Sequence, residues 1–562
     1  MKKYLLAQTI NELNFILKNF KKKEIVCIPL NLEQILYCEK KKINFININN
    51  FLSNEVHKKC LLTSNDIIKN LKFDNYFEQN IKLEFIGILR FRINLLIFIL
   101  ELLNNINNHI KIETIVLSGW IEENPINLNC YFLQRFRGVL ESKYKVVSLK
   151  KKIIKNSKSS IDFKFISQKK INNNNINILM NNGGYNFKRF FLSNIKRNYS
   201  YFFFSSKKIN FLKRIILYFL NSHPVYYKKI KSQKKIINIF FKLGYNKNLL
   251  IEESLITIMK DYNLYFNSLL NFQKKIKQFL SDHKFSLVIS NICKGLEGSF
   301  IQEAQKKNIA TLCISHGTIA KHFNKYDKIY KKTIAEAVFS AKSKYFAIQS
   351  KIFNDALHTH KINGKTINSG NLIFAENHSK NILKKKYILY AVTLKNLYNF
   401  QVYGVEFFYE FYNNLESLNK LALINELNIM VNIHPSHRHL KKDLQKKFNN
   451  LIFKCENIAT LLKNTYATIS FSSTVIEDSL NSKIPVILFD PWKRYQHCEI
   501  KTKNSNSSCL YYVNSYEKLI SCINAIKKNK LNFKYDFNKY VFLKKSYLNI
   551  NKIIKYILMI KQ

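Results

Sequence analysis

Short apolar runs alternate with helix-like stretches along most of this chain. In residues 1–149, the apolar run Ile25–Leu30 is followed by a helical pattern at Leu32–Lys40 and a second apolar run at Ile43–Ile48. A third apolar run, Ile112–Ser118, comes later. Such alternation predicts strand–helix–strand units with a parallel sheet.

The same alternation is clearer in the second half of the chain. Most of its apolar runs are continuous rather than alternating, which is typical of strands covered on both faces. The predicted strands are Phe285–Ser290, Ala310–Ser315, Tyr345–Gln349, Tyr387–Val392, Ile429–Ile433, Leu451–Phe453, Ala467–Phe471 and Pro485–Phe489. The fold class predicted is therefore α/β, with two facing Rossmann-like domains built on parallel sheets.

Between residues 150 and 235 the pattern is lost in sequence rich in Lys, Asn, Ser and Phe, such as KKINNNNINILMNNGG. We interpret this stretch as a basic, low-complexity and partly flexible insertion. The predicted organisation is an N-terminal Rossmann-like part (1–149), this insertion (150–235), the remainder of the N-terminal domain (236–375), and a C-terminal domain with a terminal helix (376–562).

Composition adds a strong positive charge: 91 Lys and Arg stand against 37 Asp and Glu in 562 residues, a net charge of +54. With 47% hydrophobic residues the chain can bury a core, which excludes a disordered protein. Only nine of the 91 basic residues are Arg, the side chain that phosphate and base recognition favours. The sequence also has no helix-turn-helix, RNA-recognition or zinc signature, so nucleic acid is not the favoured partner.

The ten cysteines form no C-x-x-C pair, and the most apolar run, Leu95–Leu100, is far shorter than the ~20 residues of a membrane-spanning helix. The first residues are too polar for a secretory signal. We expect a cytoplasmic protein.

Polar clusters directly after predicted strands are the candidate site, because ligands of parallel α/β sheets bind at the carboxyl ends of the strands. The first cluster is Ser315-His316-Gly317-Thr318, where His316 is a candidate general base. A second, weaker one is the loop that starts at Thr393. Either could instead be an ordinary polar loop.

The third cluster is His434-Pro435-Ser436-His437-Arg438-His439. Pro435 ends the strand, and three imidazoles with an arginine suit a diphosphate or carboxylate. No carboxylate or Cys stands at ligand spacing, so metal binding is the less favoured use. A solvated loop is the alternative.

The fourth cluster is Ser472-Ser473-Thr474, which precedes a predicted helix with Glu477 three residues after Thr474. Hydroxyls and free N–H groups at a helix start can hold a phosphate. The alternative, a capping box between Thr474 and Glu477, is compatible with that use.

Taken in order, His316-Gly317, Ser369-Gly370-Asn371, His434-Pro435, Ser472-Ser473-Thr474 with Glu477, and the strand entry at Lys483–Val486 resemble bacterial surface-polysaccharide glycosyltransferases of the GT-B fold. The resemblance covers roughly residues 285–498. It includes capsule polysaccharide biosynthesis proteins, bacterial sialyltransferases and CDP-glycerol glycerophosphotransferases. The non-hydrolysing UDP-N-acetylglucosamine 2-epimerases share the architecture.

This resemblance implies that His434 and Ser472–Thr474 hold the phosphates of a nucleotide-sugar donor, and that Glu477 contacts its ribose. From their own loops, Arg438 and Thr393 are further candidates for the same phosphate site. It implies His316 as a base or acceptor ligand. The acidic motif of the sialyltransferases has no clear copy, and Glu297-Gly298 is its nearest match, so Glu297 is the second candidate base.

The function expected is transfer of a sugar to a surface polysaccharide or lipid-linked glycan, without metal or other cofactor. The basic, aromatic segment Lys188–Phe204 could contact the anionic inner membrane, or simply be a solvated insertion. Alternatives are a sugar-nucleotide 2-epimerase on the same fold, a polyanion-binding protein that is not an enzyme, and a catalytically inactive scaffold.

Overall fold

The computed structural model describes most of the chain. The described residues are 2–73, 78–125, 131–155, 159–167, 171, 175–181, 199–205, 211–219, 221–232, 236–292, 294–315, 317, 319–339, 343–357, 359–360, 362, 364–374, 386–391, 394, 403–501, 508–529, 535–542 and 550–559.

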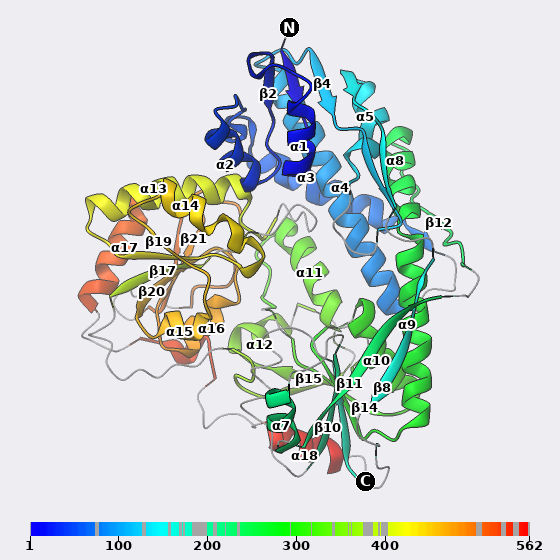
Figure 1. The fold of residues 1–562 in the computed structure, drawn as a ribbon. Helices are drawn as coiled ribbons and strands as arrows, with labels where there is room; N and C mark the ends of the chain where they lie inside the picture. The colour runs from blue at the N-terminus through cyan, green and yellow to red at the C-terminus, as the bar shows by residue number, and fades with distance from the viewer. Residues whose placement is uncertain are drawn as a thin grey trace.

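The C-terminal domain is built on a parallel sheet of six strands (Figure 1). In spatial order these are β19 (Ile452–Lys454), β18 (Ile429–Asn432), β17 (Tyr387–Ala391), β20 (Thr465–Ser470), β21 (Val486–Phe489) and β22 (Leu510–Val513). Numbered from β17, the order is 3-2-1-4-5-6, the doubly wound Rossmann order. The strand order therefore reverses between β17 and β20.

Helices connect these strands and cover the sheet, as the apolar strand sequences require. They are α13 (Phe408–Ile424), the 3-10 helix η6 (Pro435–Leu440), α14 (Lys441–Lys447), α15 (Ile458–Leu462), α16 (Val475–Asn481) and α17 (Tyr516–Asn529). The predicted elements of this domain are confirmed to within a few residues at their ends.

A second domain is built on an eight-stranded sheet. In spatial order its strands are β16 (Lys365–Asn368), β15 (Tyr345–Ile348), β14 (Ala310–Cys313), β13 (Leu287–Ser290), β9 (Asn177–Met180), β10 (Ser200–Ser205), β11 (Ser222–Lys231) and β8 (Ile161–Ser167). All pairs are parallel except that of β8 with β11. Without β8 the order is again doubly wound, with its reversal between β9 and β13, so the two predicted Rossmann-like domains are confirmed.

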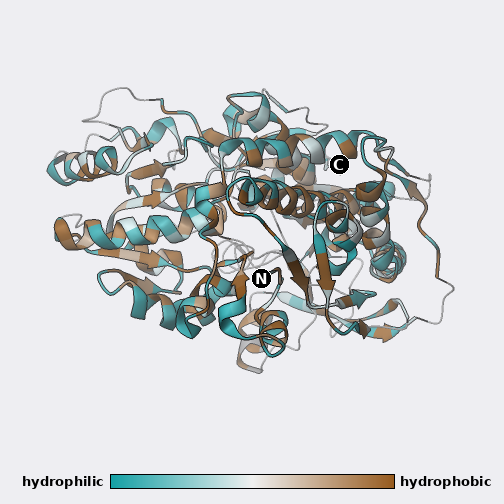
Figure 2. Cartoon of the chain, turned by 90° about the horizontal axis from the view of Figure 1, so that it is seen from above, coloured by the Kyte–Doolittle hydropathy of each residue, from teal (hydrophilic) through white to brown (hydrophobic). Residues whose placement is uncertain are grey.

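Helices of this second domain come from both sides of residue 236. They are α7 (Phe211–Phe219), α9 (Asn263–Asp282), α10 (Gly295–Lys306), α11 (Lys325–Phe339) and α12 (Lys351–Leu357). Helix α8 (Leu249–Asp261), which precedes α9, instead buries its apolar residues in a core shared with residues 1–149. Figure 2 shows hydrophobic and hydrophilic residues alternating along most helices, as expected where one side faces a core.

The prediction that residues 150–235 form an insertion separate from the domain is wrong. Strands β8 to β11 come from this stretch, and β9 and β10 lie inside the eight-stranded sheet. Tyr201, Phe202, Phe203 and Phe204 of β10 are buried, so these four aromatic side chains of the segment Lys188–Phe204 are not available to a membrane surface. The prediction failed because Lys and Asn surround the short strand segments of this stretch. One of them is NILM, which forms β9 and pairs with β10 and β13.

Residues 1–149 form a sheet of their own rather than part of the larger one. Its four parallel strands are β2 (Ile25–Cys27), β1 (Lys3–Leu5), β4 (Thr114–Leu117) and β6 (Lys145–Ser148). The predicted strand Ile43–Ile48 contributes only a bridge between Phe45 and Cys27. Two small pairs join β3 (Lys72–Phe73) to β12 (Phe241–Lys242) and β5 (Trp120–Glu123) to β7 (Lys152–Lys155).

Helices of this N-terminal part link it to both other domains. They are α1 (Ile10–Leu17), α2 (Leu32–Lys41), α3 (Asn54–Lys69), α4 (Gln79–Asn107) and α5 (Arg137–Glu141), with the 3-10 helices η1 (Lys22–Glu24), η2 (Ile48–Phe51) and η3 (Leu133–Phe136). Phe98 of α4 packs against Phe407, just before α13, with ring centroids 4.9 Å apart. The core is therefore continuous between the N-terminal part and the C-terminal domain.

The terminal helix was predicted within the C-terminal domain, and that placement is wrong. Helix α18 (Ile550–Met559) packs its buried residues Ile550, Ile553, Ile554 and Ile557 against the eight-stranded sheet. A short 3-10 helix, η7 (Phe537–Lys539), precedes it. The domain boundary predicted at residues 375/376 lies outside the described residues.

The carboxyl edges of the two large sheets face each other. Ser350 follows β15 at one edge, and its hydroxyl donates to the Glu477 carboxylate of α16 at the other, over 2.5 Å. Lys331 of α11 is 4% exposed and donates to the carbonyls of Gln496 and His497, beyond β21. In the part of the chain described here, no helix combines the length and apolarity needed to cross a bilayer.

Candidate functional site

The candidate site lies where the strand order of the six-stranded sheet reverses, because that crevice binds ligands in doubly wound folds. The loop after β20 carries Ser472, Ser473 and Thr474, and the loop after β18 carries His434. Both strands are direct neighbours of β17. Two clusters far apart in sequence thus follow strands on either side of β17.

The turn at Ser472 is tied to the loop after β17. Its hydroxyl donates to the carbonyl of Gly404, which also accepts a hydrogen bond from Tyr330 of α11 at 3.4 Å. Gly404 has a positive φ of 64°, a conformation that glycine adopts at little cost. The Gly404 carbonyl therefore accepts hydrogen bonds from a hydroxyl of each large domain, Ser472 of the C-terminal domain and Tyr330 of the eight-stranded domain.

The capping box predicted for Thr474 and Glu477 is wrong. Thr474 is the N-cap of α16, but its side chain makes no capping hydrogen bond. Glu477 is 1% exposed, and its carboxylate accepts a hydrogen bond from the Ser350 hydroxyl. The packing of the two domains provides a partner that the local sequence cannot reveal.

The loop after β18 orders its imidazoles through Ser436. The Ser436 backbone N–H donates to His434 Nδ1 at 3.3 Å, so this nitrogen is an acceptor and the hydrogen of a neutral ring lies on Nε2. The Ser436 hydroxyl lies 2.7 Å from the same Nδ1 and 3.0 Å from His437 Nδ1. His434 can therefore present an N–H donor to an anion.

His437 is the inner member of this group. It is 9% exposed, and burial, together with the charges of His434 and His439, lowers the pKa of His437 to about 4. The ring is thus neutral near pH 7. The resulting order has His437 Nδ1–H donating to Ser436, and the Ser436 hydroxyl donating to His434.

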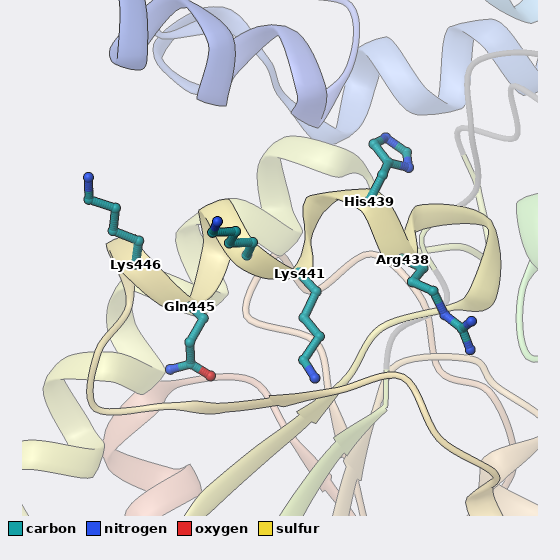
Figure 3. Close-up of a pocket in the computed structure, with 6 residues that line it drawn as sticks. Arg438, His439, Lys441, Gln445 and Lys446 are labelled. Carbon is teal, nitrogen blue, oxygen red and sulfur yellow. The ribbon is translucent and has the colours of Figure 1, made fainter.

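Arg438 does not join the Ser472 turn through any hydrogen bond or ion pair among the described residues. It is exposed and lines an open groove with the lysines of α14 (Figure 3). His316 and Thr393 lie outside the described residues, so the structure places neither of them.

Glu297 lies in the first turn of α10, which follows β13 at the reversal point of the eight-stranded sheet. Burial, and then the negative charge of Glu84, raise the pKa of Glu297 to about 6, while Lys294 opposes the shift. A carboxyl group with this pKa is suited to general base catalysis near neutral pH.

A buried ion pair that the sequence analysis missed supports the turn at Ser472. Arg494 donates to both oxygens of Glu410, at 3.0 and 2.5 Å, and to the carbonyl of Val405 at 2.9 Å. Its guanidinium also lies 5.0 Å from the ring centroid of Phe471, directly before Ser472. The signal was present, because Asp490 and Arg494 follow the apolar run that forms β21.

Two further buried acids surround this pair. Asp490 accepts from the Tyr495 N–H at 2.7 Å and from the Tyr512 hydroxyl at 3.0 Å. Glu406 accepts from Tyr390 and Asn414, and burial raises the pKa of Glu406 to about 7. Among the described residues, no three His, Cys, Asp or Glu side chains are grouped as a metal site would require.

No protein-family model matches this sequence, and no curated protein matches it. Solved structures do show similarity. A putative UDP-N-acetylglucosamine 2-epimerase from Listeria monocytogenes is 9% identical, covering 63% of this chain and 90% of its own, with a TM-score of 0.37.

Two other solved structures are similar at the same level. The UDP-GlcNAc 2-epimerase from Neisseria meningitidis, bound to UDP-GlcNAc, is 13% identical over 69% of this chain and 100% of its own, with a TM-score of 0.36. The wall teichoic acid polymerase TagF is 14% identical over 68% and 87%, with a TM-score of 0.37. The function of this chain must therefore be argued from its own residues.

Proposed function

We propose that this protein is a cytoplasmic glycosyltransferase of the GT-B type. It would move a sugar, or a sugar-like group, from a nucleotide-activated donor to a surface polysaccharide or lipid-linked glycan. The observation that supports this most is the pair of loops, Ser472–Thr474 and His434, on either side of β17 where the strand order reverses.

In this proposal the donor phosphates bind between these two loops. His434 donates through Nε2–H, and the hydroxyls of Ser472, Ser473 and Thr474 line the other side. Thr393 would complete the wall, and Arg438 would add charge from the edge. These groups stabilise the negative charge of the leaving nucleotide, so the proposal includes no metal ion.

The acceptor hydroxyl would be activated from the eight-stranded domain. A base removes its proton, the oxygen bonds to the anomeric carbon, and the bond to the donor phosphate breaks with its electrons leaving on the phosphate oxygen. Glu297 and His316 are the two candidate bases. Glu477 is held by Ser350, so a contact with the donor ribose would require this hydrogen bond to open or to be shared.

Binding of a nucleotide is the direct test of the proposed site. We expect one of CMP, CDP, UDP, GDP or ADP to raise the melting temperature of the purified protein, because a ligand specific for the folded state stabilises it. At 100 times Kd the expected gain is about 2.7 kcal/mol. No shift with any of them, in protein shown to be folded, would contradict the assignment.

The variant for this test is His434→Asn. Its side-chain oxygen can still accept from the Ser436 N–H, but the Nε2–H donor is lost. We expect the nucleotide-induced shift to disappear. The matched control is His439→Ala in the same 3-10 helix, whose ring points away from Arg438 and toward the N-terminal helices in Figure 3. It should keep the shift.

The pH dependence tests Glu297 as the base. Since its pKa is about 6, it is ionised above this pH and protonated below it. We expect kcat/KM to fall about tenfold per pH unit below 6 and to level off above it, and Glu297→Gln to lower kcat roughly 10²–10⁴-fold.

Glu84→Gln is the control for this assignment. The negative charge of Glu84 raises the pKa of Glu297, so its removal should move the acid limb of the profile to lower pH. If the acid limb of the kcat/KM profile stays in place in Glu84→Gln, and Glu297→Gln keeps full activity, Glu297 is not the base and His316 is the remaining candidate. Conversion of a nucleotide sugar without acceptor, with solvent deuterium entering the sugar, would instead favour the epimerase alternative.

A further inference from the structure

A basic groove lies on the C-terminal domain beside the loop that carries His434. It has a volume of about 550 Å³ and is open to solvent. Helices η6 and α14 supply its lining, which is Arg438, His439, Lys441, Lys442, Gln445 and Lys446 (Figure 3).

Gln445 fixes the floor of this groove to the edge strand of the sheet. Its side chain donates to the carbonyl of Leu451 at 2.8 Å and accepts from the N–H of Phe453 at 3.0 Å. Because α14 is anchored in this way, the lysines of the groove project from a fixed helix rather than from a free loop. Lys441 and Arg438 extend on the same side as Gln445 in Figure 3.

Four cations of the groove differ from their neighbours in forming no ion pair. Around the groove, ion pairs join α14 and η6 to acidic or basic residues of α2, as in Lys447 with Glu39, His439 with Glu33, and Asp443 with Lys40. In contrast, Arg438, Lys441, Lys442 and Lys446 form no ion pair with any residue that the structure describes. They are exposed, and Asp443 of the same helix pairs with Lys40 instead, at 3.4 Å.

We propose that this groove binds a linear anionic glycan chain. Lys442 and Lys446 are four residues apart and therefore share one face of α14, so they can contact neighbouring anionic groups of one chain at once. Lys441 and Arg438 line the other side of the groove, next to Gln445 (Figure 3). Three of the four cations are lysines, which act as point charges and select for charge spacing rather than for the planar geometry that arginine reads.

The lining argues against two other polyanions. Its one ring is the imidazole of His439, whose Nε2 lies 3.7 Å from Glu33 Oε1, and it has no Phe, Tyr or Trp on which successive bases could stack, as single-stranded nucleic acid binding requires. It also has no large apolar side chain that could enter the acyl region of a bilayer. A charged chain without bases or acyl groups is what this surface complements.

The test is binding of dextran sulfate to the full-length protein, with neutral dextran as the uncharged match of the same backbone. We expect Lys441→Gln with Lys446→Gln to weaken dextran sulfate binding at least about tenfold, and to flatten the salt dependence, because fewer counterions are released. The matched control is Lys527→Gln with Lys528→Gln on α17, two exposed lysines of the same domain. It should change the affinity less than about twofold.

Equal weakening by the two double variants would overturn the inference, since the groove would then be only part of a diffuse charge of +54. The inference would also be overturned if the protein bound an unstructured DNA oligonucleotide or phosphatidylglycerol vesicles more tightly than dextran sulfate, and if Lys441→Gln with Lys446→Gln abolished that binding. The identification of the bound polyanion as a glycan rests on the proposed function. The binding test itself uses no nucleotide, so it is independent of the proposed nucleotide site. The nucleotide-induced melting shift should persist in Lys441→Gln with Lys446→Gln, so either proposal can fail without the other.

Discussion

Replacing Arg494 by Met is expected to lower the free energy of unfolding by about 3–5 kcal/mol, because removing one partner leaves a buried charge uncompensated. The side chains of Arg494 and Glu410 are only 1% and 4% exposed, so bulk solvent does not reach the two carboxylate oxygens that would lose their hydrogen bonds. Urea unfolding of the two proteins gives the difference directly.

Two comparisons show whether the cause is the uncompensated charge. The double variant Arg494→Met with Glu410→Leu should recover much of the loss, since a buried ion pair can often be replaced by apolar residues. Arg137→Met breaks the exposed pair with Glu141 in α5 and should cost less than about 1 kcal/mol. Equal losses in Arg494→Met and Arg137→Met would refute the argument from burial.

The substitution Arg494→Met should also weaken nucleotide binding at temperatures where the variant stays folded. The Arg494 guanidinium packs against Phe471 and holds the carbonyl of Val405, which follows Gly404. Both contacts position the loops on either side of the proposed phosphate site. A variant that binds nucleotide as tightly as the original protein would show that these loops hold their shape without Arg494.

Replacing Gly404 by Ala is the second change with a large expected effect, a loss of about 2–5 kcal/mol. Its φ of 64° costs an alanine about 1–2 kcal/mol. The added Cβ would also lie 2.0 Å from Cε1 of Tyr330, and such overpacking costs about 1–3 kcal/mol. The Tyr330 ring cannot easily move aside, because it packs against Tyr403 and Tyr495 at 6.0 and 5.8 Å.

The measurement is again the unfolding midpoint, with a second glycine as control. Gly138 of α5 has open space around its Cα, so Gly138→Ala should stabilise the protein by roughly 0.5–1 kcal/mol through the lower entropy of the unfolded chain. Adding Tyr330→Ala to Gly404→Ala should recover the part of the loss that comes from the clash. If the double variant is no more stable than expected from independent losses, the clash is not the cause.

Much of the C-terminal domain could be predicted from the sequence because its signals are local. The apolar runs that form β17, β18, β20 and β21 each sit within one window of the chain, and polar residues follow each run directly. The same criterion would have found Asp490 and Arg494 after β21. It failed for β9 and β10, where Lys and Asn dominate the surrounding composition and only short apolar runs remain.

The sequence by itself determined that this protein is α/β, where most strands and helices of its second half begin and end, and which loops carry His434 and Ser472–Thr474. Hydrophobic periodicity and turn residues act within a few positions, so these features can be read locally. Only the tertiary structure decided that β17 lies between β18 and β20, that Glu477 binds Ser350, and that Arg494 binds Glu410. Those choices depend on which distant segments bury one another, and no local pattern records the free energy of that packing.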